Sequence, residues 1–585
     1  MSNNHNERLS RRSWLGLATT ASIGSAFLAT PSNVLAAANS VDTSGKSNTN
    51  TPATPGPNAP WPSAPGAPDK NNGARIYNIR DFGAKGDGQA LDTAAVQAAI
   101  DACTKDEGGT VLVPAGIFVI GTIEMKSNVT LHIAAQGKLL GSADGKQYHA
   151  ADAIPLSGDT TLNDGNVGLI FAVKAENMVI EGLGTIDGQG SQFRSPTKGV
   201  LPPAGISGPH RPYHLLFYQC KNFSVRDIFL LKSAFHSVRI IQCEFVKLEG
   251  IHINGRVVNN NDGFHFVSSR YVHLSNCDVQ CQDDACALFG SCQFITVTNC
   301  SFSTRWSVFR FGGGEARNIT VSNCLIYETY GCPVKMRCGP GNVFEDISFS
   351  NIVMKDVTGP ISIGLGPQHG HAAAPGQSPG IVRNISFSGI HGTVVKPVQL
   401  RDTEFTSHYN PGEEFSCITL NGVDEGFLEN ISFNDVHISF PGGGTAEQAA
   451  VRDVPKLAGE YYEIGVPPAY GVYARNVKGL TLHNIRFSMA SPDLRPALIF
   501  DHVQDAAVNG LSVQGDKRSE SLLRFIESGD ILLTAMRVLT PVSVFLGVEG
   551  AGSHNIKIDG GDLLKAEAPL SFKAGADPKS VRLRE

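Results

Sequence analysis

Residues 271–324 read YVHLSNCDVQCQDDACALFGSCQFITVTNCSFSTRWSVFRFGGGEARNITVSNC, and this stretch decides the fold. A Ser/Thr-Asn-Cys triplet occurs in it three times, ending at Cys277, Cys300 and Cys324, so the period is 23 to 24 residues. A short run with alternating apolar residues precedes each triplet, as in a β-strand with one buried face. Short strands and polar turns that repeat at this period are typical of a solenoid.

The repeat extends over most of the chain. Weaker copies, which keep the apolar alternation without the triplet, begin at Phe223, Val246, Ile347, Ile385, Ile431 and Leu480. A leucine-rich repeat would need regular leucines and an outer helix, and neither pattern is present. We therefore expect an all-β fold, a right-handed parallel β-helix, with adjacent coils about 4.8 Å apart. The repeated Asn residues should hydrogen-bond along the axis as a ladder, and several of the cysteines should stack as small buried residues with free thiols.

Two segments precede the repeats. Residues 1–38 contain Arg11-Arg12, an apolar stretch and then small residues, which predicts a twin-arginine-type export signal. A membrane anchor is the alternative, but Gly, Ser and Thr interrupt the apolar stretch. Residues 39–73 are rich in Pro, Ser, Thr, Gly and Asn and predict a flexible linker. We expect the catalytic β-helix domain to span residues 74–575.

A short helix should close the first coil. Residues 92–102 have the apolar spacing of an amphipathic helix, with Asp92 or Thr93 near its N-cap. Such a helix would shield the apolar interior at the end of the coil stack, as terminal caps do in solenoids.

The net charge, the apolar runs and the cysteine spacing restrict the kinds of partner that the protein can have. A formal net charge of -6 argues against a nucleic-acid partner. No later run is long and apolar enough to span a membrane, so we expect a periplasmic or secreted protein, without a membrane partner once mature, and a monomer. Cys277, Cys281 and Cys286 lack matching histidines, so neither a metal site nor a cofactor is expected.

Acidic residues gather at the ends of two successive coils. Asp262 lies 21 residues before Asp283 and 22 before Asp284, about one coil. Stacking would bring the three carboxylates within one or two strand spacings, where like charges raise at least one pKa. The alternative is that they are only turn residues, but their register with the repeat favours a function. Neighbouring residues in a strand point to opposite faces, so the chain must bend for all three to meet.

These motifs resemble a known family. Segments 79–88 (IRDFGAKGDG), 108–116 (GGTVLVPAG) and 182–190 (GLGTIDGQG), followed by Asn260-x-Asp262 and Asp283-Asp284, resemble family 28 glycoside hydrolases, the polygalacturonase-like enzymes, in order and spacing. The similarity covers roughly Ala74 to Val513. It implies hydrolysis, with inversion, of an acidic plant cell-wall polysaccharide or oligosaccharide of the pectin type. By this resemblance Asp283 is the general acid, and Asp262 with Asp284 activates water.

Two departures from the family pattern affect substrate binding. The family has a Gly-His-Gly segment one coil later, whereas residues 304–307 contain no His and Arg305 falls in its place. The family's Arg-x-Lys reads Lys335-Met336-Arg337 here, and the swap matters because only Arg binds a carboxylate bidentately. A solvated strand face is the alternative for these cations. The expected substrate-binding residues are Asn260, Arg305, Arg310, Lys335 and Arg337.

Other functions remain open at this point. A polysaccharide lyase on the same scaffold would use Ca²⁺ with an Arg or Lys base, and acidic clusters suit Ca²⁺. A non-catalytic carbohydrate-binding β-helix is the third possibility, because the family His is missing. Insertions at residues 144–164, 194–210 and 364–380 are expected to wall off the groove and favour attack at a chain end; the last of these includes Gln368-His369-Gly370-His371, expected to be a groove-lining loop.

Overall fold

The computed structural model describes residues 75–151, 154, 166–193, 211–368, 377–396, 412–424, 426–459 and 461–584. The expected export signal at 1–38 and linker at 39–73 lie outside these residues, as do most of the three expected insertions, including His369 and His371. Within the described residues, no helix is both long enough and apolar enough to cross a membrane.

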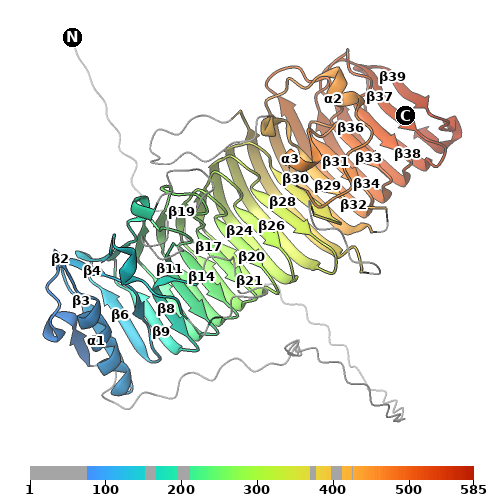
Figure 1. Ribbon diagram of the computed structural model, residues 1–585. Helices are drawn as coiled ribbons and strands as arrows, with labels where there is room; N and C mark the ends of the chain where they lie inside the picture. The colour runs from blue at the N-terminus through green and yellow to red at the C-terminus, as the bar shows by residue number, and fades with distance from the viewer. Residues whose placement is uncertain are drawn as a thin grey trace, which may run out of the picture. The chain divides into compact units, whose positions relative to one another are not determined.

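The described coils form a right-handed parallel β-helix, as the repeat predicts (Figure 1). Its strands belong to two long parallel sheets. Sheet B has 15 strands: β5 (Ile123–Glu124), β8 (Gly168–Val173), β11 (Tyr213–Tyr218), β14 (Val238–Ile241), β17 (Phe264–Val267), β20 (Cys286–Phe289), β23 (Phe309–Gly312), β25 (Val334–Cys338), β27 (Ile361–Leu365), β29 (Ile418–Asn421), β31 (Val472–Arg475), β33 (Leu498–Asp501), β35 (Leu523–Ile526), β37 (Val542–Glu549) and β39 (Ala566–Lys573).

Sheet A has 25 strands and bends around a corner of each coil. They are β1 (Ile76–Asn78), β2 (Asp87–Leu91), β3 (Gly109–Val113), β4 (Gly116–Ile120), β6 (Val129–Ile133), β7 (Gly137–Gly141), β9 (Glu176–Glu181), β10 (Thr185–Asp187), β12 (Lys221–Arg226), β13 (Phe229–Leu231), β15 (Glu244–Glu249), β16 (His252–Asn254), β18 (Arg270–Ser275), β19 (Asp278–Gln280), β21 (Gln293–Thr298), β22 (Ser301–Ser303), β24 (Glu315–Thr329), β26 (Val343–Val357), β28 (Ile381–Val394), β30 (Leu428–Phe440), β32 (Val477–Met489), β34 (Gln504–Val513), β36 (Gly529–Val538), β38 (His554–Asp562) and β40 (Val581–Arg584).

Helices are few and short in the described residues. The α-helices are α1 (Thr93–Lys105), α2 (Ala446–Ala450) and α3 (Tyr461–Ile464), and the 3-10 turns are η2 (Ile79–Phe82), η3 (Gly145–Gln147), η5 (Gly190–Phe193), η6 (Glu413–Phe415) and η7 (Pro578–Ser580). Helix α1 begins where the sequence predicts and packs against β1, β3, β5 and β6 of the first coils. Asp92 precedes it, and its carboxylate accepts hydrogen bonds from the backbone N–H groups of Lys85 (2.8 Å) and Gly86 (3.0 Å).

The interior is a continuous stack of apolar side chains. Register places Ile295, Ile319, Ile347, Ile385 and Ile431 at one position of successive coils, all buried. The rings of Phe349, Phe387 and Phe433 stack in the next inward position, 5.0 and 4.9 Å apart. Each such side chain contributes roughly 1.5–3 kcal/mol on burial, so the repeat itself supplies the core.

The cysteines behave as expected, and the Asn ladder does so only in part. All twelve cysteines lie in the described residues, where each is buried and none forms a disulfide. The thiols of the three triplets donate alike, each to the backbone carbonyl two residues earlier at 3.2 Å. Asn351 donates to Asn323 (3.1 Å), but Asn276 donates instead to Glu249 (3.3 Å). These corner Asn residues have positive φ angles, a conformation that Asn tolerates better than most residues.

The outer face of sheet B is covered at two places. Near the N-terminal coils, Ala151 and Ile154 pack with outward residues of β8, β11 and β14 in a first outer cluster. Near the C-terminal coils, Val454 and Ile464 pack on Tyr473 of β31 in a second outer cluster. Residues 454–464, without residue 460, are called the covering segment below. The first cluster reaches Val267 of β17 and Phe289 of β20, in the same coils as the acidic residues, and the second cluster lies further along the axis.

Candidate active site

Asp262 and Asp284 occupy the same position in adjacent coils. Each lies two residues before a strand of sheet B, Asp262 before β17 and Asp284 before β20. The register between these strands pairs Phe264 with Cys286, which places the two aspartates side by side. The backbone agrees, because the N–H of Gly263 donates to the carbonyl of Asp284 at 3.0 Å. His236 takes this position one coil earlier and Ser307 one coil later.

The chain bends at Gln282 and Asp283, which brings Asp283 to the same edge. The backbone N–H groups of both residues donate to the carbonyl of Asn261, at 3.2 and 3.3 Å, and this double contact pins the bend. The half-buried carboxylate of Asp283 accepts hydrogen bonds from the Asn260 side chain (3.2 Å) and from the backbone N–H of Asp284 (2.9 Å). The bend that the sequence required is therefore present.

The three carboxyl groups interact electrostatically. Burial raises the pKa of Asp262 well above its usual value, and the nearby charges of Asp283 and Asp284 raise it further, while Arg239 and Arg211 act in the opposite direction. Only 4% of Asp262 is exposed. The hydroxyl of Ser307 donates a hydrogen bond to the Asp284 carboxylate. The site thus places a carboxyl group with a raised pKa beside two further carboxyl groups.

Sequence reasoning missed two histidines beside Asp262. The His265 Nδ1 atom lies 2.8 Å from one carboxylate oxygen of Asp262, and the His236 Nε2 atom lies 3.6 Å from the other. Burial lowers the pKa of both histidines well below the usual value, so both rings are neutral near pH 7. The position of His265, three residues after Asp262, was the available signal, whereas His236 was hidden because its coil is 26 residues long.

These three residues also have the spacing of a metal site. Among the described residues, His236, Asp262 and His265 form the one group whose ligand atoms all lie within 4.8 Å of one another. The two rings, however, lie almost parallel, with an interplanar angle of 20° and centroids 4.5 Å apart. Stacked rings do not aim their nitrogen atoms at one point, so the arrangement fits a hydrogen-bonded pair better than a shared ion.

A further arginine supports the acidic turn. Arg211 is 4% exposed and donates to the carbonyl of Asn259 (2.5 Å) and to the side chain of Asn260 (3.3 Å). Asn260 in turn donates to Asp283. Arg211 therefore fixes the position of Asn260, which in turn orients Asp283. Sequence reasoning missed it, because it lies 49 residues before Asn260.

The structure separates the predicted cationic residues into two groups. Arg310 and Lys335 are register neighbours on the outer face of β23 and β25, in the column that continues from His265. The Lys335 ammonium lies 4.4 Å from the ring centroid of Trp306, and the guanidinium of Arg305 lies 5.1 Å from that of Tyr330. Lys335 and Arg305 are only 3% and 5% exposed, so they do not belong to a solvated strand face.

Arg337 belongs to a different outward column, and the covering segment engages its guanidinium. Its Nη2 atom lies 2.9 Å from a carboxylate oxygen of Glu463, and its Nε–H donates to the carbonyl of Ala458 at 2.8 Å. Arg337 therefore anchors the covering segment to sheet B. This contact is the clearest difference between the expected substrate-binding set and the geometry.

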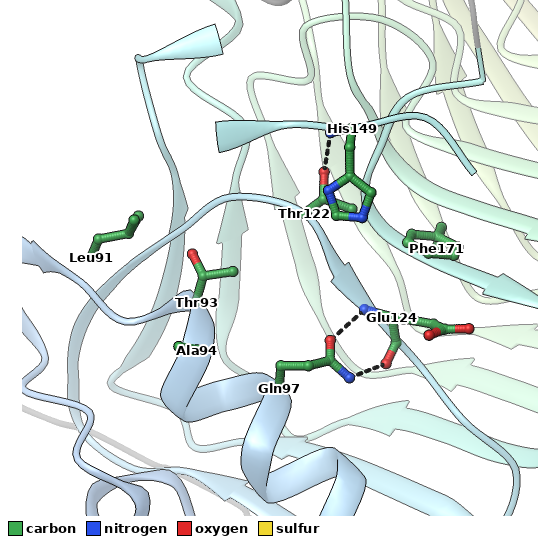
Figure 2. Close-up of a pocket in the computed structure, with 8 residues that line it drawn as sticks. All are labelled: Leu91, Thr93, Ala94, Gln97, Thr122, Glu124, His149 and Phe171. Atoms are coloured by element: carbon green, nitrogen blue, oxygen red, sulfur yellow. Dashed lines mark hydrogen bonds between the residues drawn. The ribbon is translucent and has the colours of Figure 1, made fainter. Parts of the chain in front are cut away.

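A separate pocket lies toward the first coils. It has a volume of about 390 Å³ and is lined by Leu91, Thr93, Ala94, Gln97, Thr122, Glu124, His149 and Phe171 (Figure 2). The Gln97 side chain accepts from the backbone N–H of Glu124 (2.8 Å) and donates to its carbonyl (3.2 Å). Glu124 is the single carboxylate in this lining. Because glycoside hydrolysis needs a pair of carboxyl groups, the acidic edge of sheet B is the better candidate.

Known proteins resemble this chain over most of its length. The model of the family "Glycosyl hydrolases family 28" matches residues 103–415. An exopolygalacturonase of Platanus acerifolia is 25% identical over 396 residues, which cover 66% of this chain and 96% of the relative. Polygalacturonase-2 of Solanum lycopersicum is 25% identical over 378 residues, or 62% of this chain and 80% of the relative.

Solved structures agree with the fold. An exopolygalacturonase from Thermotoga maritima aligns with a TM-score of 0.52 at 18% identity, covering 71% of this chain and 92% of that one. A family 28 exopolygalacturonase from Yersinia enterocolitica aligns with a TM-score of 0.55 at 18% identity, covering 74% of this chain and 78% of that one. At this identity the likeness concerns the fold.

Proposed function

This chain belongs to family 28 of the glycosyl hydrolases, and we propose that it hydrolyses galacturonate-containing, pectin-type polysaccharide with inversion at the anomeric carbon. One observation carries the proposal: Asp262 and Asp284 stack in register, and the bend at Asp283 adds a third carboxyl group to the same edge. Inverting hydrolysis needs one protonated carboxyl group to protonate the leaving oxygen and an ionised one to activate water.

Asp283 has the surroundings expected of the general acid in this mechanism. It is the most accessible of the three, and the Asn260 amide fixes its orientation. As the leaving oxygen departs, the proton moves from the Asp283 carboxyl group to that oxygen. Asp262 and Asp284 accept the proton of the attacking water, and the Ser307 hydroxyl stabilises the carboxylate of Asp284.

Arg310 and Lys335 account for an acidic substrate. They come from adjacent coils and are therefore about 4.8 Å apart in the outward column that begins beside the acids. A sugar carboxylate bound there would be attracted to both cations. Trp306, which Lys335 contacts, offers an apolar ring face on which a sugar can pack.

Attack at a chain end is the proposed mode. The first outer cluster covers sheet B up to the coils that carry the acids, and the second covers it further along the axis. The covering segment also contacts Asn421, whose side chain donates to the carbonyls of Pro455 and Leu457, both at 3.0 Å. A long polysaccharide lying across the acids along the helix axis would meet these covers. Three of the similar proteins described above are named exopolygalacturonases, which agrees with this mode.

The cellular setting follows from the sequence alone. The Arg11-Arg12 pair and the apolar stretch after it support export through a twin-arginine-type route to the periplasm or the medium. We propose that the mature enzyme acts there as a monomer.

Product analysis tests the function. The purified protein is incubated with polygalacturonate, methyl-esterified pectin, a rhamnogalacturonan and, as a neutral control, dextran. Release of reducing ends from the acidic polymers, with the inverted anomer appearing first in the NMR spectrum, would support the proposal. Products that absorb in the near ultraviolet, and that disappear on chelation, would instead identify a lyase. Binding without release of reducing ends would identify a carbohydrate-binding protein.

A further inference from the structure

His265 lies between two aromatic rings. Its ring stacks on His236 at a centroid distance of 4.5 Å and on Phe289 at 5.0 Å, with interplanar angles of 20° and 26°. Only 4% of its side chain is exposed. A ring stacked on both faces cannot turn about its Cβ–Cγ bond without displacing its neighbours. The edge carrying Nδ1 therefore stays directed at Asp262.

The carboxyl group of Asp262 meets an imidazole at each oxygen. Oδ2 lies 2.8 Å from His265 Nδ1, and Oδ1 lies 3.6 Å from His236 Nε2. His236 reaches this position because it precedes β14 as Asp262 precedes β17. The backbone of the acid and both imidazoles are thus fixed by the same coil register.

The charged groups around the pair are Arg239, Arg211, Asp283 and Asp284. Arg239 is the register neighbour of His265 on β14, and its guanidinium donates to the hydroxyl of Tyr213 at 3.2 Å. Beside these cations the imidazoles stay neutral, and a neutral imidazole donates one N–H. In the tautomer that carries its proton on Nδ1, His265 donates to the Asp262 carboxylate and favours its ionised form, which is the form that activates water.

We propose that His265 is a positioning residue for Asp262, and that His236 keeps the His265 ring in place by stacking on it. The proposal rests on the proposed function for its kinetic test. Segment 304–307 contains no histidine, so in this enzyme the imidazoles beside the acids come from β17 and from the turn before β14. Neither ring has to touch the substrate for this role.

Paired substitutions separate positioning from packing. In His265→Asn the side-chain amide places an N–H close to where Nδ1–H stands, whereas His265→Leu fills similar space without a donor. We expect His265→Asn to retain kcat within about threefold and His265→Leu to lose roughly tenfold to a hundredfold in kcat, with KM changed by less than about threefold. The acidic limb of the pH–rate profile should move to higher pH in His265→Leu only, because the ionised form of Asp262 loses its donor.

Variants of His236 and of the control residue His214 complete the set of substitutions. His236→Phe keeps the stacking and should stay within about fivefold of the parent enzyme, while His236→Ala removes it and should resemble His265→Leu. His214, which is 1% exposed, is the buried control on β11, and His214→Asn should leave the acidic limb in place. Equal rates for His265→Asn and His265→Leu, or a loss confined to KM, would overturn the proposal.

A crystal structure of His265→Leu gives a readout that needs no substrate. The Asp262 carboxyl group should take a different side-chain rotamer from the parent enzyme, whereas in His265→Asn it should stay in place. An unmoved carboxyl group in His265→Leu contradicts the positioning role even if the protein hydrolyses no pectic polymer. Failure of the parent protein on every polymer would refute the proposed function instead. If His265→Leu does not fold, the His236→Phe and His236→Ala pair decides.

Discussion

The outer faces of the two sheets follow the same strand alternation but differ in what lies on them. In sheet A, outward residues such as Lys247, His273 and Thr320 are exposed. In sheet B, the outward residues Arg239 and Lys335 are 1% and 3% exposed. The strands themselves do not cause this difference: in the residues that the structure describes, segments outside the coils cover the outer face of sheet B at two places, whereas Lys247, His273 and Thr320 face solvent. Burial is therefore what distinguishes the outward cations of sheet B from those of sheet A.

Removing the proposed general acid should give the largest difference in rate between a substitution at the acidic edge of sheet B and one on sheet A. We expect Asp283→Asn to lower the rate on polygalacturonate by at least about 100-fold, as expected when a general acid is lost. Asp278→Asn is the matched control, because Asp278 lies on β19 of sheet A with 59% of its side chain exposed. Reducing-end assays and thermal unfolding measure both variants. An Asp283→Asn enzyme with normal turnover would remove the acid assignment.

Breaking a covered ion pair should give the next largest difference, in stability rather than rate. Arg524 on β35 is fully buried and contacts Glu520 (2.6 Å) and the carbonyl of Ala449 (2.7 Å). Arg524→Ala removes one donor from each acceptor, although Arg452 still contacts both, and it leaves a cavity where the buried side chain stood, so it should destabilise the C-terminal coils by about 2 kcal/mol. Arg537→Ala, at an exposed position of sheet A, should change stability by less than about 0.5 kcal/mol. Denaturant titrations that give equal midpoints would contradict the comparison.

Removing the charge of a proposed substrate-binding residue should have a smaller effect on the rate. Lys335→Met keeps the apolar stem over Trp306 but removes the charge, so kcat/KM on polygalacturonate should fall about tenfold through KM. Lys247→Met, on the exposed face of sheet A, should have no measurable effect. Initial rates over a range of substrate concentrations measure both variants. A normal KM for Lys335→Met would remove Lys335 from the substrate-binding set.

The pH dependence is the finest test, because it requires no substitution. The raised pKa of Asp262 means that its carboxyl group is still protonated above the pH at which an exposed Asp ionises. Water activation needs the ionised form, so the rate should fall as the pH decreases through this raised pKa. In the same range Asp262 contributes less stability as the pH rises, since the folded protein holds a proton that the unfolded chain has released. A pH–rate profile with its acidic limb at or below the ordinary Asp pKa would contradict the burial argument.

The sequence predicted what depends on the repeat. The coil stack, the start of α1 near Asp92, the free cysteines and the neighbouring positions of Asp262 and Asp284 all follow from period and alternation. Contacts between coils of unequal length could not be predicted from the period. His236 lies 26 residues before Asp262, while Asp284 lies 22 after it, so no fixed period reveals the three together.

Long-range contacts were beyond sequence reasoning for a different reason. Glu463 reaches Arg337 across 126 positions, from a segment that shows no repeat. Its partner therefore depends on how residues 454–464 cross the sheet, which apolar contacts with Tyr473 and Ile499 determine. The ladder bond of Asn276 is absent for a local reason: the register places Gly250, which has no side-chain acceptor, opposite Asn276 in the preceding coil, and Glu249 accepts instead.

The free, buried thiols bear on where this protein can mature. Because none of its twelve cysteines is bridged, the coils need no oxidant or disulfide isomerase to assemble, and reductants should not loosen them. Oxidants in the surroundings would find no accessible thiol to modify, since thiol reactivity requires an exposed thiolate. The enzyme can therefore complete its folding in a reducing compartment and keep the same shape in an oxidising one.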